Sequence, residues 1–119
     1  MTYSLSLPLP PSTNKRLIKA RGGFFILSGE ARAWLEEANL LIKSFCNKEK
    51  IKPINDYFHL DLEVYLPRSN SDSHNYLKLL CDSLEQGGLV ENDKYIMPRI
   101  QKVKVDSVNP RVRLSFTAN

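Results

Sequence analysis

Five short segments of the chain have the hydrophobic patterns of β-strands. The clearest is "YFHLDLEVYLP", residues 57–67, in which Phe58 and every second residue after it are apolar, while the residues between them are mostly polar. The same alternation occurs in residues 2–8, and residues 23–28 form a short apolar run. Two further strands are predicted near the end of the chain, at residues 99–108 and 110–117.

Two other segments have apolar residues at helical spacing. The first is predicted at residues 29–47, with Ser28 as its N-cap and Glu30 in its first turn. Its apolar stripe consists of Trp34, Leu35, Ala38, Leu41, Ile42 and Phe45. The second is predicted at residues 74–86 and ends at Gly87 and Gly88. Its core face is expected to be Tyr76, Leu77, Leu80, Cys81 and Leu84.

The order of these elements, β-β-α-β-α-β-β, predicts an α+β domain with both helices packed against one mixed sheet. We expect residues 23–28 to return beside residues 2–8, and the last two strands to form a hairpin around the Asn-Pro pair between them. A chain of 119 residues suits one domain, here residues 1–119, with a single core.

The charged residues indicate a moderate preference for polyanions. Seventeen Lys and Arg against thirteen Asp and Glu give a net charge of +4. One basic group is the loop containing Lys15, Arg16, Lys19 and Arg21, and the other is Lys94, Arg99, Lys102, Lys104, Arg111 and Arg113. Either group is a phosphate-binding candidate or simply a solvated surface. We favour phosphate binding for the loop, because the glycines after Arg21 allow close approach of the backbone.

The same sequence sets an expected location. The chain has no apolar run of the roughly 20 residues that a membrane helix needs. It also lacks the features of a secretion signal at its start. Both cysteines, Cys46 and Cys81, lie in helical patterns, so we expect reduced thiols and a cytoplasmic protein.

The second predicted helix has polar residues that allow two interpretations. Wound at 100° per residue, it places Asn75, Lys78 and Asp82 together opposite the core face, with His74 at the border. Asp72 precedes this helix, and Glu91 and Asp93 follow it in a loop that can fold back toward it or away. An ordinary capped helix with an i, i+4 surface pair explains these residues. A catalytic site also explains them if the fold brings the carboxylates together, which spacing does not show.

A resemblance favours the catalytic interpretation. The stretch "DSHNYLKLLCDSLEQGGLVENDKYI" resembles the signature of the RusA family of Holliday junction resolvases, as do "LPLPPSTNKR" near the start and the Ser28-x-Glu30 pair. The resemblance implies that Asp72 and Asp93 are catalytic aspartates and Lys78 the catalytic lysine.

Other positions of the motif are less regular. Asn75 and Asp82 match further motif positions with supporting roles. The chain departs from the pattern at His74, where the family has a second aspartate, and at Asn92, the first residue of the usual final Asp pair. Glu91, which is out of register, is a candidate to replace the lost charge.

The resemblance further implies a metal-dependent endodeoxyribonuclease that binds branched DNA and resolves four-way junctions by paired nicks, in recombination and repair. Its Mg²⁺ would be held by Asp72 and Asp93. His74 is either a third ligand, whose imidazole would also suit Mn²⁺, or a residue of the first helical turn without metal contact. Paired nicks imply a homodimer, for which Leu79, off the predicted core face, is a candidate contact.

Two alternatives remain at this stage. One is a junction-binding protein of the same fold with weak or lost nuclease activity, because His74 interrupts the acidic cluster. The other is a small nucleic-acid-binding domain in which the carboxylates are structural.

Overall fold

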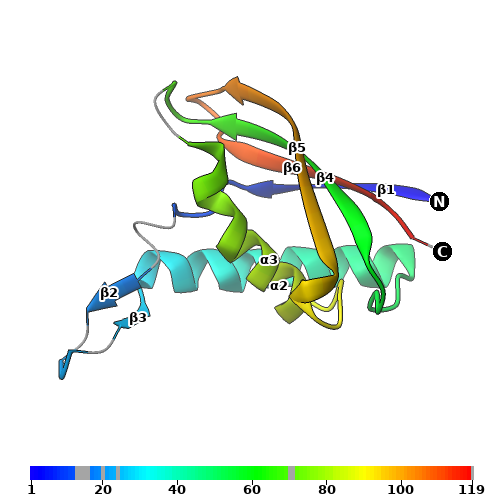
Figure 1. Ribbon diagram of the computed structural model, residues 1–119, viewed down its shortest axis with the longest axis horizontal. Helices are drawn as coiled ribbons and strands as arrows, with labels where there is room; N and C mark the ends of the chain where they lie inside the picture. The colour runs from blue at the N-terminus through cyan, green and yellow to red at the C-terminus, as the bar shows by residue number, and fades with distance from the viewer. Residues whose placement is uncertain (13–16, 20, 24, 70–71, 119) are drawn as a thin grey trace.

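A computed structural model describes residues 1–12, 17–19, 21–23, 25–69 and 72–118, without the side chains of His74 and Asn75. Its centre is a mixed four-stranded sheet (Figure 1). The strands are β1 (Thr2–Pro8), β4 (Phe58–Leu66), β5 (Ile96–Val105) and β6 (Arg111–Thr117), in the spatial order β1-β6-β4-β5. β4 pairs parallel with β5, and the other pairs are antiparallel.

The expected hairpin between the last two strands is wrong, because β4 lies between β5 and β6. β4 alternates between buried apolar residues and partly exposed polar ones along most of its length. A strand with a fully apolar face is best buried at the centre of the sheet, where it has a neighbour on each side. The parallel β4–β5 pair then requires a crossover, which the second helix provides.

A separate two-stranded sheet precedes the first helix. β2 (Leu17–Lys19) pairs with β3 (Phe25–Leu27), and the turn between them uses Gly22 and Gly23 at φ of 95° and 90°. Only glycine adopts such angles readily. The strand from the apolar run at 23–28 therefore pairs with β2, and the prediction that it returns beside residues 2–8 is wrong. β2 is an additional strand, so the order is β-β-β-α-β-α-β-β.

The first helix, α2 (Gly29–Glu49), closely matches its prediction. The Oγ of Ser28 accepts a hydrogen bond from the Ala31 N–H at 3.1 Å, which confirms the N-cap. Trp34 Nε1 donates to the Pro8 carbonyl at 2.9 Å and so fastens the helix to the end of β1. Most of the predicted stripe is buried, but Leu41 is exposed.

The second helix differs more from its prediction. A 3₁₀ turn, η1 (Ser73–Tyr76), precedes α3 (Leu77–Gln86), so the α-helix begins three residues later than expected. Its fully buried residues are Leu79, Leu80, Ser83 and Leu84. Leu79 is only 2% exposed, and its assignment as a dimer contact is wrong. α3 packs against α2 as well as the sheet, so its buried stripe is rotated toward Leu79 and Ser83.

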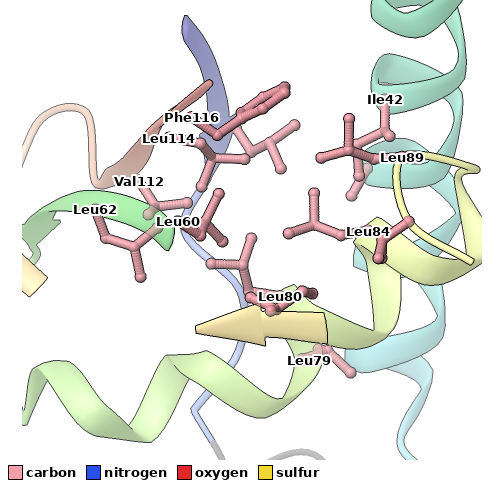
Figure 2. Close-up of a cluster of buried hydrophobic side chains, with 14 of the residues drawn as sticks. Ile42, Leu60, Leu62, Leu79, Leu80, Leu84, Leu89, Val112, Leu114 and Phe116 are labelled. Atoms are coloured by element: carbon pink, nitrogen blue, oxygen red, sulfur yellow. The ribbon is translucent and has the colours of Figure 1, made fainter. Parts of the chain in front are cut away.

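The core lies between the sheet and the two helices, which cover one of its faces (Figures 1 and 2). Figure 2 shows apolar side chains of β4 and β6 directed toward those of α2 and α3. Among them are Leu60, Leu114, Ile42, Leu80 and Leu84, each at most 1% exposed. Within the described residues, no helix is both long enough and apolar enough to cross a membrane. Both cysteines are free thiols.

Candidate active site

Two adjacent glycines end α3 and set the direction of the loop that follows. A Cβ on Gly87 would lie 2.8 Å from Ile42 Cβ, so glycine is needed there for α3 to pack closely on α2. Gly88 has φ of 90°, and its N–H donates to the Glu85 carbonyl at 3.2 Å. The pair thus turns the chain sharply back along the helix.

The loop after this turn is anchored by two buried side chains and by backbone hydrogen bonds to Ile54. Leu89 and Val90 are each 1% exposed, and Val90 forms a parallel bridge with Ile54. The Ile54 N–H donates to the Leu89 carbonyl, and the Glu91 N–H donates to the Ile54 carbonyl, both at 2.9 Å. These contacts hold the loop in a fixed position beside α3.

Asp93 is brought back to the helix by two contacts. Its backbone N–H donates to Glu85 Oε1 at 2.8 Å, and its carboxylate Oδ2 lies 3.8 Å from Lys78 Nζ. Lys78 also donates to Asp82 Oδ1 at 3.0 Å. The ammonium group therefore lies between two carboxylates, one from the helix and one from the loop. The folded chain joins the two motif segments that spacing alone left unconnected.

The charged side chains of the cluster also act on a neighbouring thiol, that of Cys81. Desolvation, followed by the charges of Asp93 and Asp82, raises the pKa of Cys81 to about 11, while Lys78 opposes the shift. Both carboxylates therefore act on one small region beside α3. Two partly exposed carboxylates close to each other are suited to bind a cation.

The remaining predicted residues lie just before or within η1 and in the loop that follows α3. Asp72 is exposed and immediately precedes η1, to which His74 and Asn75 belong. The α-helix itself begins after Tyr76, which provides no side-chain cap. Glu91 is exposed. Asn92 Oδ1 accepts the Lys94 N–H at 2.9 Å and caps the 3₁₀ turn η2 (Asp93–Tyr95). The residue that departs from the family pattern at 92 therefore has a local structural role.

Glu85 was missed by sequence reasoning. It lies seven residues after Lys78 and three after Asp82, so it belongs to the same helical face. That spacing was a usable signal. Its hydrogen bond to the Asp93 backbone, however, depends on the path of the loop, which no helical pattern encodes.

The predicted DNA-binding loop is described only in part. Lys19 ends β2 and Arg21 lies in the turn, and both are exposed. Lys15 and Arg16 lie outside the described residues. Gly22 and Gly23, expected to allow backbone approach to phosphate, form the turn of the hairpin.

The residues of the cluster suit a hard divalent cation. Asp82 and Asp93 in the cluster, and Asp72 just before η1, offer carboxylate oxygens, which are the ligands that Mg²⁺ prefers. Within the described ranges, no three His, Cys, Asp or Glu side chains form a ready-made metal cage. Mg²⁺ usually binds through one or two carboxylates, several waters and the phosphates of its substrate, so this sparse donor set fits it.

The comparison with protein families agrees with the motifs. The family model described as endodeoxyribonuclease RusA matches residues 8–117, nearly the whole chain. No curated protein matches the chain significantly. The family match confirms the resemblance and includes every acidic and basic residue considered above.

Proposed function

The chain belongs to the RusA family of endodeoxyribonucleases, which resolve Holliday junctions, and we propose that Asp72, Lys78 and Asp93 are its catalytic residues. The observation that carries this proposal is the 3.8 Å approach of Lys78 Nζ to Asp93 Oδ2. A surface ion pair between Lys78 and Asp82 alone would not require the loop to return to the helix. The return instead unites the acidic and basic groups that phosphodiester hydrolysis uses.

Family members are metal-dependent, and we propose Mg²⁺ bound by Asp72 and Asp93, with His74 as a third candidate ligand. Bound Mg²⁺ supplies a water of lowered pKa and neutralises charge on the phosphodiester. The carboxylate donors described above support this assignment. An imidazole ligand would extend the preference to Mn²⁺, which accepts nitrogen more readily than Mg²⁺ does.

Lys78 has a distinct role in this proposal. Its side chain is 54% exposed, so its ammonium group is accessible to a phosphate oxygen from outside the protein. There it stabilises charge on the scissile phosphate or on the leaving oxygen. Asp82, in hydrogen-bond contact with Lys78, orients the ammonium group. Asn75 and Glu91 are further supporting residues in this proposal.

The substrate is branched DNA, and we propose that a homodimer cuts it, because two symmetric nicks need two equivalent sites. With Leu79 buried, another surface must join the copies. The β2–β3 hairpin exposes Leu17, Ile18, Phe25 and Ile26, and Phe25 is 64% exposed. The hairpin is therefore the first surface to test as a dimer contact. The free thiols suit the reducing cytoplasm that we propose as its location.

Single-turnover cleavage of a synthetic four-way junction tests the catalytic assignment. Asp72→Asn and Asp93→Asn should each abolish cleavage and leave junction binding equal or tighter, because each removes one negative charge with little change of shape. Glu36→Gln, which removes one charge from the exposed face of α2, is the matched control and should cut normally. Parent-like cleavage by either Asn variant would show that the site is elsewhere. A parent protein that binds junctions but never cuts them would favour the binding-only alternative.

A further inference from the structure

The sheet has a second face, directed away from α2 and α3, which we call the open face (Figure 1). Strand register determines its residues, because side chains directly opposite each other on paired strands point to the same side. Three rows of residues cross this face, each read from β1 through β6 and β4 to β5. They are Ser6, Arg113, Glu63 and Lys102; Pro8, Arg111, Tyr65 and Lys104; and Ser4, Ser115, Asp61 and Arg99. The neighbours of these residues along β4, such as Leu60 and Leu62, are fully buried on the helix side.

Basic residues dominate the open face. Its five cations are Arg99, Lys102, Lys104, Arg111 and Arg113. Two of them are neutralised locally: Arg99 Nε donates to Asp61 Oδ1 at 2.7 Å, and Arg111 Nη1 donates to Asp106 Oδ2 at 2.8 Å. Arg111 also covers the Tyr65 ring, with its guanidinium carbon 3.8 Å from the ring centroid.

The other three cations remain available to an outside partner. Lys102, Lys104 and Arg113 are exposed, and no ion pair is recorded for them among the described residues. Glu63, the remaining carboxylate of the face, accepts a hydrogen bond from the Tyr65 hydroxyl at 2.9 Å. Arg113 donates its Nε to Ser4 Oγ at 3.1 Å. The face therefore presents three cations that form no ion pair within the described residues, and one further carboxylate, Glu63, lies across the strands from Lys102 and Arg113.

The uncharged residues of the face suit the same partner. Ser4, Ser6, Thr2 and Thr117 are exposed along β1 and the end of β6. Short hydroxyl side chains project little from the sheet, so a duplex can approach the backbone closely. They also donate hydrogen bonds to phosphate oxygens, as Lys and Arg do. Lys102 and Lys104 lie two residues apart on edge strand β5, about 6.6 Å along the strand. β5 begins three residues after Asp93, and Lys102 and Lys104 lie toward its far end, away from the candidate site.

We propose that the open face binds the phosphodiester backbone of a duplex arm of the branched DNA substrate. This inference rests on the family's activity on DNA but not on the identity of the catalytic residues. DNA is the expected partner because of charge complementarity: three exposed cations outside any ion pair of the described residues, against the single carboxylate of Glu63, lie on one face with exposed hydroxyl groups. The contact is independent of sequence, because it involves phosphates and not base edges.

The test compares two triple variants that remove the same charge. Lys102→Gln/Lys104→Gln/Arg113→Gln neutralises the open face, and Arg32→Gln/Lys43→Gln/Lys48→Gln neutralises three exposed cations on α2. Binding to a four-way junction and to linear duplex is measured across a salt series with chelator present, so that cleavage plays no part. The open-face variant should bind both DNAs more weakly, and the slope of log K against log salt should fall by up to about 0.9 for each lost contact.

The α2 variant should keep the parent slope. Equal slopes for the parent and the open-face variant, or equal losses in both triple variants, would overturn the proposal. A second variant, Ser6→Glu, places a carboxylate opposite Arg113 without removing any cation and should also weaken binding. Unchanged melting temperatures establish that all variants fold.

The outcome is separable from that of the catalytic proposal. If the parent protein cuts junctions but the open-face variant keeps the parent slope of log K against log salt, this inference is wrong and the catalytic proposal is unaffected. A slope loss in a protein whose Asp93→Asn variant still cuts would remove the catalytic assignment and leave the open face as a DNA-binding surface.

Discussion

The carboxylate of Glu85 accepts a hydrogen bond from the backbone N–H of Asp93 at 2.8 Å. This bond joins the last turn of α3 to the loop that carries the proposed catalytic aspartate. It acts together with the buried side chains of Leu89 and Val90, which fix the earlier part of the loop. Asp93 is therefore placed by a residue that lies within the recognised stretch of sequence but matches none of its motif positions.

Replacing Glu85 should reveal this positioning role. Glu85→Ala removes the acceptor and should slow cleavage by about 10–100-fold, the usual effect of losing a partner that orients a metal-site residue. Glu85→Gln keeps a carbonyl oxygen that can accept the same N–H, and it should retain most of the activity. Metal titration of cleavage provides a second readout, because the Ala variant should need more Mg²⁺ for half-maximal rate. Equal rates for the two variants would indicate that the bond does not matter for catalysis.

The sequence predicted some of these features better than others. Periodicity located β4, α2 and the face shared by Lys78 and Asp82, because these depend on local spacing. Strand partners were mispredicted, because the position of β4 between β5 and β6 depends on which strand is best covered by the helices. Leu79 was mispredicted because α3 packs against two neighbours and not one.

For the candidate site too, some features could be predicted from the sequence and others could not. Its residue types came from a motif, whereas the meeting of Asp93 with Lys78 depends on a glycine turn and on the anchoring of the loop at Ile54. No spacing rule gives the path of such a loop. Gly87 is an example: glycine is required at this position because any side chain would collide with Ile42, a residue of another helix.

Lys78 should matter more for rate than for binding. Lys78→Ala should slow single-turnover cleavage by about 100-fold or more, because its proposed contact forms with charge that develops in the transition state. Junction affinity should change far less. If Lys78 only pairs with Asp82 on the surface, the same change should leave the rate intact and cost a few tenths of a kcal/mol in stability. Asp82→Asn is the comparison variant and should reduce the rate by less than Lys78→Ala does.

The pKa of the Cys81 thiol is raised first by burial and then by the charges of Asp93 and Asp82, so its reactivity reports in part on those charges. With its pKa raised to about 11, its thiolate fraction at pH 8 should be about 100-fold below that of a thiol with the ordinary pKa of 9.0. The rate of alkylation, followed separately for each cysteine by mass spectrometry, should be correspondingly slow and should rise steeply between pH 9 and 11.

Charge removal should change this rate selectively. Asp93→Asn and Asp82→Asn should both lower the pKa of Cys81 and speed its alkylation, because both carboxylates raise it. Glu91→Gln, which also removes one acid from this part of the chain, should have little effect. An equal response to all three changes would contradict the placement of Asp82 and Asp93 beside the thiol.

The basic loop should contribute to DNA affinity through phosphate contacts. Replacing Lys15, Arg16, Lys19 and Arg21 by Gln should weaken binding to every DNA tested. Each lost contact should reduce the slope of log K against log salt by about 0.9. An unchanged slope would mean that this loop faces solvent when DNA is bound. The α2 charge variant described above, which removes three cations against four here, is the control and should keep the parent slope.

The most informative position is His74, where the chain departs from its family. If His74 is a metal ligand, the site is less negative than one with three aspartates and binds Mg²⁺ weakly. Mn²⁺ accepts nitrogen, so cleavage should be low in Mg²⁺ and rise in Mn²⁺. The rate should also fall below about pH 6, because an imidazole with a reference pKa of roughly 6.5 must lose its proton to bind a metal. His74→Asp should restore an oxygen ligand and shift the preference back toward Mg²⁺.

If His74 merely occupies the 3₁₀ turn before α3, its replacements should behave differently. His74→Asp and His74→Ala should then match the parent in both metals and across pH, apart from a small charge effect near the start of the helix. Cleavage rates against metal identity and pH for the three proteins distinguish the cases. Identical metal preferences would eliminate His74 as a ligand. The two aspartates would then be the only protein ligands proposed, with water and substrate phosphate completing the coordination, as is common for Mg²⁺.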